Sequence, residues 1–107
     1  MPPRLSPLET TLLAAFAHEV RARFGPRVRA LTLFGSRARG AGHDESDLDV
    51  FVLIDGMSRE DRRDVIDLAA DLGLDSNLIL SPLVADAGAW REDFPIAAEI
   101  AADGVPL

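Results

Sequence analysis

Two aspartates separated by one residue stand directly before an apolar run in the middle of the chain. Asp47-Leu48-Asp49 leads into Val50-Phe51-Val52-Leu53-Ile54, and such a run predicts a buried strand. Because side chains alternate between the faces of a strand, Asp47 and Asp49 are expected on one face, with Leu48 in the core. Two carboxylates this close repel each other unless a cation lies between them, and hard oxygen ligands favour Mg²⁺ or Mn²⁺. The pair is therefore a candidate metal site.

A small-residue turn precedes the aspartate pair. The run Leu31–Phe34 predicts a strand, Gly35-Ser36 interrupts it, and a short polar segment follows at Arg37–Gly40. A turn that leads into a helix N-terminus leaves backbone N–H groups free to bind an anion. We therefore expect phosphate on this turn and metal on the aspartate pair, as two parts of one site for a nucleoside triphosphate.

The two segments together resemble a known signature. Gly-Ser, ten further residues and Asp-x-Asp, preceded by Leu33-Phe34 and followed by an apolar strand, is similar to the pattern of the minimal nucleotidyltransferases of the DNA polymerase β superfamily. The matching segments are Leu33–Gly40 and Ser46–Val50, and a weaker similarity extends over Pro95 to Val105. The resemblance implies Mg²⁺-dependent transfer of a nucleoside monophosphate from a triphosphate, with ATP as the expected donor.

The resemblance also implies a role for each matching residue. Asp47 and Asp49 would hold two Mg²⁺ ions, with Mn²⁺ as an alternative metal. Gly35 and Ser36 would bind the β- and γ-phosphates. Arg37 or Arg39 would neutralise the charge that develops on the leaving pyrophosphate.

A third carboxylate is expected on the strand that faces the aspartate pair, because active members of this family carry one there as metal ligand and base. We interpret Leu74–Val84 as that strand, and the two-residue period places Asp75 and Asn77 on one face. Asp75 would complete the metal site or accept the proton. Asn77 at that position would leave the site one negative charge short. The spacing leaves both alternatives open.

Helix signals flank these strands. A capping box at Ser6–Glu9 predicts a helix that ends at Gly25-Pro26. Ser58 predicts the cap of a second helix, which we expect to end at Gly73. The segment Asp86–Asp103 predicts one or two further short helices. The expected fold is α/β, a small mixed β-sheet with helices packed mainly on one side, formed by residues 1–107 as a single domain.

The composition of the chain excludes some classes of site and partner. The chain has no cysteine, which excludes disulfides and thiolate-bound zinc. The net charge of −7 opposes direct binding to nucleic acid. No apolar run approaches the length of about 20 residues that a membrane span requires. We therefore expect a cytoplasmic protein with neither nucleic acid nor membrane as its partner.

The acceptor of the nucleotide is the main open question. A domain of this size has no room for a tRNA platform or an antibiotic pocket, so the acceptor surface is expected on another chain. By resemblance, such domains pair with a helical HEPN protein in toxin–antitoxin modules and, in some cases, adenylylate a tyrosine of the toxin. Protein adenylylation is the leading hypothesis. The alternatives are a catalytically weakened module that neutralises its partner by contact alone, and transfer to a small hydroxylated molecule across a homo-oligomer interface.

Overall fold

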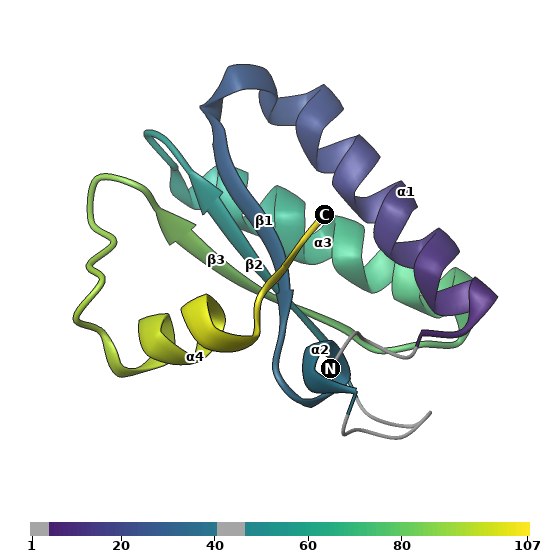
Figure 1. Ribbon diagram of the computed structural model, residues 1–107. Coiled ribbons are helices and arrows are strands. Elements are labelled where there is room, and N and C mark those ends of the chain that lie inside the picture. Colours follow the sequence, from purple (N-terminus) through teal and green to yellow (C-terminus); the bar gives the residue numbers. More distant parts are fainter. Residues whose placement is uncertain (1–4, 41–46) are drawn as a thin grey trace.

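The computed structural model describes residues 5–40 and 47–107, so Ser46 of the second matching segment lies outside the described residues. The elements in chain order are α1 (Pro7–Phe24), a 3-10 turn η1 (Gly25–Arg27), β1 (Val28–Phe34), α2 (Ser36–Arg39), β2 (Leu48–Ile54), α3 (Arg59–Ser76), β3 (Leu80–Asp86), α4 (Pro95–Asp103) and β4 (Val105–Pro106) (Figure 1).

A mixed sheet forms the centre of the described chain. Its strand order is β3-β2-β1-β4; β1 is antiparallel to β2 and to β4, whereas β2 is parallel to β3. A parallel pair needs a crossover connection, which here is α3. Helices α1 and α3 lie on one face of the sheet and the short α4 on the other (Figure 1). The predicted fold class is confirmed.

Both long helices begin where capping boxes predict. The Glu9 N–H donates to Ser6 Oγ (3.1 Å), while the Ser6 N–H donates to Glu9 Oε1 (2.8 Å). Ser58 and Asp61 make the same reciprocal pair at the start of α3. Each box satisfies two N–H groups that a helix start leaves without partners. Within residues 5–40 and 47–107, no helix is both long and apolar enough to cross a membrane.

Alternation along β2 divides the interior into two clusters. Leu48, Val50, Val52 and Ile54 belong to the main core, which α1 and α3 complete. On the opposite face, Phe51 packs with Phe34 and with Ile100 of α4. Asp49 precedes Phe51 by two residues, so it shares the face on which α4 lies. The candidate site therefore belongs to the less covered side of the sheet.

The prediction of a strand at Leu74–Val84 is wrong over its first part, because α3 continues beyond Gly73 to Ser76 and β3 starts only at Leu80. Asn77 ends the helix in the left-handed conformation (φ 54°), which asparagine tolerates better than most residues. Gly73 has a packing role instead: a Cβ there would lie 2.7 Å from the Leu78 carbonyl oxygen. The glycine permits close contact between the helix and the following chain.

Candidate active site

The aspartate pair lies where β1 ends and β2 begins. Asp47 directly precedes β2 and is exposed, whereas Asp49 is half-buried and lies opposite Phe34 in the antiparallel register. Burial raises the pKa of Asp49, and the negative charges of Asp47 and of Glu99 on α4 raise it further. The pair thus carries negative charge that a cation at this position would stabilise.

The predicted phosphate turn contacts this pair directly. Gly35 has φ 79° and ψ −162°, a backbone conformation that is essentially restricted to glycine. A Cβ at Gly35 would lie only 2.5 Å from Asp49 Oδ2, so the carboxylate occupies the space that any side chain would need. Ser36 then begins α2. Hard carboxylate oxygens beside a glycine cradle suit a divalent cation and its bound phosphate, so these residues fit the group that the sequence predicts.

Asp75 does not join the pair, contrary to prediction. It lies on the last turn of α3 and is exposed, while Asn77 is the cap residue of the same helix. Among the described residues, no group of three or more His, Cys, Asp or Glu side chains could hold a metal ion. The prediction failed because α3 runs three residues past the glycine that was expected to stop it.

Ser81 occupies the position on β3 that faces the pair. It is the parallel partner of Asp49 in the register, and its hydroxyl donates to Asp47 Oδ2 at 3.2 Å. The carboxylate of β3, Asp86, lies at the other end of the strand and accepts the Met57 N–H at 3.2 Å. A hydroxyl can coordinate a metal, but it is a poor general base at neutral pH. The residue of β3 beside Asp49 therefore has a neutral side chain.

Arg37 is a structural residue in this fold, contrary to its predicted contact with pyrophosphate. Its side chain is buried, and Nη2 donates to both carboxylate oxygens of Glu9, at 2.6 and 2.8 Å. Burial alone would raise the pKa of Glu9, but the Ser6 N–H and the Arg37 guanidinium outweigh it, and the pKa is lowered. Sequence reasoning missed this pair, although the capping glutamate was visible. The pair anchors α2 to the start of α1.

Arg39 remains beside the site but is already paired. Its Nη1 lies 3.1 Å from Asp103 Oδ2 and 3.6 Å from Glu99 Oε1, both on α4, and the arginine side chain is partly exposed. Such half-exposed ion pairs are weak, so the side chain can exchange partners readily. Glu99 was also missed from sequence. Glu99 could have been considered from sequence, because it lies within the Pro95–Val105 segment, which weakly resembles the family.

Comparisons with known proteins identify the family of this domain. The family model described as "Nucleotidyltransferase domain" matches residues 13–93. A curated relative from Methanocaldococcus jannaschii, named "Putative protein adenylyltransferase", is 27% identical over 74 residues, which cover 68% of this chain and 75% of the relative.

Two solved structures share the fold. One, described as a "putative minimal nucleotidyltransferase", has a TM-score of 0.60 and 24% identity, and the match covers 94% of this chain and 95% of the other. The second is an MNT antitoxin in complex with the tri-AMPylated HEPN toxin of Shewanella oneidensis. It has a TM-score of 0.54 and 18% identity, with coverage of 90% and 69%.

Proposed function

Because this chain belongs to the nucleotidyltransferase domain family, we propose that it transfers AMP from ATP to a hydroxyl group of a partner protein, as the antitoxin of a HEPN-type module. The observation that carries the proposal is the closeness of the Gly35 turn to the Asp49 carboxylate, because it brings the proposed phosphate-binding turn next to a proposed metal ligand. The relative named as a protein adenylyltransferase and the AMPylated toxin complex support the choice of acceptor.

In this proposal each residue acts through ordinary phosphate chemistry. Asp47 and Asp49 would hold Mg²⁺, and the bound metal supplies charge neutralisation and a lowered pKa for the attacking hydroxyl. The backbone at Gly35 and Ser36, with the Ser36 hydroxyl, binds the phosphates. Arg39, which is only weakly held by α4, neutralises the leaving pyrophosphate. Ser81 orients Asp47 through its hydrogen bond.

A second candidate function has a specific observation in its favour. The residue of β3 beside Asp49 is the neutral Ser81, and Asp75 lies exposed on α3, so the structure brings no third carboxylate from either element to the pair. A weakened site of this kind suits a module that neutralises its partner by contact alone. The two functions differ in their need for the aspartates. The Asp47→Ala, Asp49→Ala double variant would stop neutralisation by adenylylation, but it would leave neutralisation by contact intact.

The first test is Mg²⁺-dependent ATP binding to the isolated chain, measured by calorimetry. We expect the Asp49→Asn variant to bind Mg·ATP at least about tenfold more weakly than the wild type, because one metal ligand loses its charge. Asp67→Asn is the matched control, since Asp67 is an exposed aspartate of α3 that makes no hydrogen bond or ion pair with the other described residues. Equal binding by wild type and Asp49→Asn would contradict the site, and absence of binding would favour the contact function.

Adding a carboxylate at position 81 should strengthen the proposed metal site. We expect Ser81→Asp to raise Mg²⁺ affinity by about tenfold or more, because it adds a charged oxygen ligand beside Asp49. Ser81→Asn is the control, because asparagine has nearly the size of aspartate but no charge. Metal titration by calorimetry measures both variants. An equal response from the two would mean that this position of β3 does not face the metal.

A further inference from the structure

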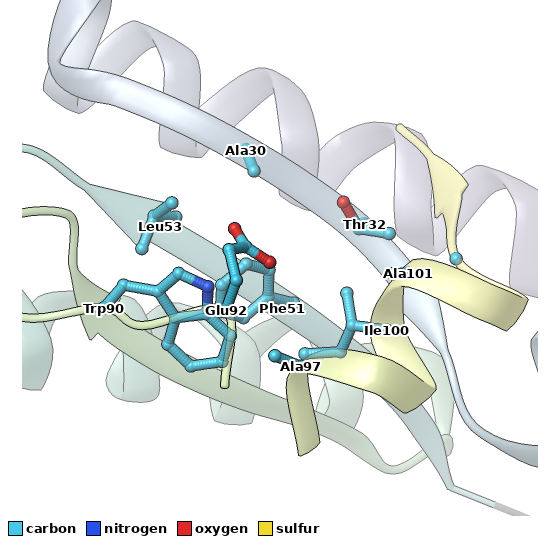
Figure 2. A pocket seen from close by; sticks show the side chains of 10 residues that line it. Ala30, Thr32, Phe51, Leu53, Trp90, Glu92, Ala97, Ile100 and Ala101 are labelled. Carbon is cyan, nitrogen blue, oxygen red and sulfur yellow. The ribbon is translucent and has the colours of Figure 1, made fainter. Parts of the chain in front are cut away.

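A pocket of about 260 Å³ lies on the face of the sheet that carries Asp49 (Figure 2). It is an open pocket bordered by β1, β2, α4 and the segment that precedes α4. The space is left open because β1 and α4 face each other with small side chains, which are Ala30 and Thr32 on β1 and Ala97 and Ala101 on α4. An apolar cavity of about 150 Å³ accepts a benzene ring. This pocket therefore has room for a planar group with a short stem.

Aromatic rings form one wall of the pocket. The Trp90 ring lies 4.6 Å from Phe51, centroid to centroid, at an interplanar angle of 44°, and the Phe94 ring meets Trp90 edge-on at 5.3 Å. These contacts hold Trp90 at the pocket in a fixed orientation. The faces of aromatic rings carry partial negative charge and attract cations, tryptophan most strongly.

The same pocket holds a carboxylate, Glu92, that has no counter-ion within the described part of the chain. Glu92 lines it, and Figure 2 shows its carboxylate in front of the Phe51 ring. The neighbours Arg91 and Asp93 bind each other at 2.8 Å, whereas Glu92 has no hydrogen bond or ion pair among the described residues. None of the lining residues is basic. Aromatic faces, a free carboxylate and small apolar walls are complementary to an organic cation.

We propose that this pocket binds the side chain of an arginine or lysine that belongs to a partner protein. The cation would contact the Glu92 carboxylate and the Trp90 ring, while its methylene stem packs on the small residues of β1 and α4. Phe51 follows Asp49 on the same face of β2, so a side chain in the pocket places the partner's backbone near the proposed transfer site. The inference rests on the proposed function only for the identity of the partner, and binding to the pocket needs neither ATP nor metal.

Tryptophan fluorescence can follow binding at this pocket, because Trp90 is the sole tryptophan and tyrosine is absent. The experiment titrates the whole chain with N-acetyl-arginine methylamide and with its neutral isostere N-acetyl-citrulline methylamide, and follows tryptophan emission. We expect a saturable change with the arginine compound at a dissociation constant on the order of millimolar. The citrulline compound should bind at least about fivefold more weakly.

Matched variants then test the carboxylate. Glu92→Gln should remove the preference for the charged compound, whereas Glu19→Gln, at an exposed position of α1, should leave it unchanged. The proposal is overturned if the two compounds bind equally, if no saturable change occurs, or if Glu92→Gln keeps the preference. Tighter binding of propylguanidinium than of the blocked arginine, by about tenfold, would identify a small-molecule site and overturn the assignment to a protein side chain. Because no nucleotide is present, failure here would not bear on AMP transfer.

Discussion

Replacing Gly35 with alanine is expected to weaken Mg·ATP binding by this chain strongly. Two costs add at the position. The backbone has φ 79°, where a Cβ costs about 1–2 kcal/mol, and the new methyl group would lie 2.5 Å from Asp49 Oδ2. The Asp49 side chain or the whole turn must move, and either shift separates the phosphate element from the metal ligand. Calorimetry should show a loss in affinity of at least about tenfold.

Gly56 provides a control that isolates backbone strain from displacement of Asp49. It also has a positive φ (65°), but nothing lies within 4 Å of where its Cβ would be. Gly56→Ala should therefore destabilise the fold by about 1–2 kcal/mol and leave Mg·ATP binding unchanged. If Gly35→Ala and Gly56→Ala behaved alike in both stability and binding, the Gly35–Asp49 contact would have no role in the site.

Local signals were sufficient for the features that depend on neighbours in sequence. Ser6 and Ser58 start helices because capping involves only the next three residues. Asp47 and Asp49 share a face because alternation is a property of the strand itself. The contact between Gly35 and Asp49 was expected in outline, since a family signature joins the two segments. The distance between them could come only from the fold.

The features that sequence reasoning missed depend on partners far along the chain. Asp75 was placed on a strand because Gly73 looked like a helix stop, but its contact with the Leu78 carbonyl makes the glycine part of the packing. Strand β4 has two residues, Val105 and Pro106, too few for any periodicity, and it exists because β1 offers a free edge. Arg37 was one of two arginines assigned to the leaving pyrophosphate, whereas its side chain binds Glu9, 28 residues upstream.

The buried pair of Glu9 and Arg37 leads to the second large prediction. Glu9→Gln should lower the free energy of unfolding by about 3–5 kcal/mol, because it removes the negative charge that the buried Arg37 guanidinium binds through both carboxylate oxygens. Only 4% and 3% of the Arg37 and Glu9 side chains are exposed, so water cannot replace the lost partner. Urea denaturation measures the change. Glu19→Gln, on an exposed face of the same helix, should alter stability by less than about 0.5 kcal/mol.

A double variant separates the need for charge from the need for packing. Glu9→Leu with Arg37→Met removes both charges, so it should be more stable than either single variant, by about 2 kcal/mol or more. Additive losses in the double variant would show that the two side chains act independently.

The pH dependence follows from the lowered pKa of Glu9 in the folded state. The pair's stabilisation should be fully present above the unfolded pKa of Glu9 and should be lost as pH falls through its lower folded pKa. Glu9→Gln should flatten this part of the acid-stability profile. Arg37 directly follows Ser36, so the double variant also tests whether the anchoring of α2 matters to the site. If stability is restored but Mg·ATP binding is weakened, the ion pair, and not packing alone, holds the Gly35 turn against Asp49.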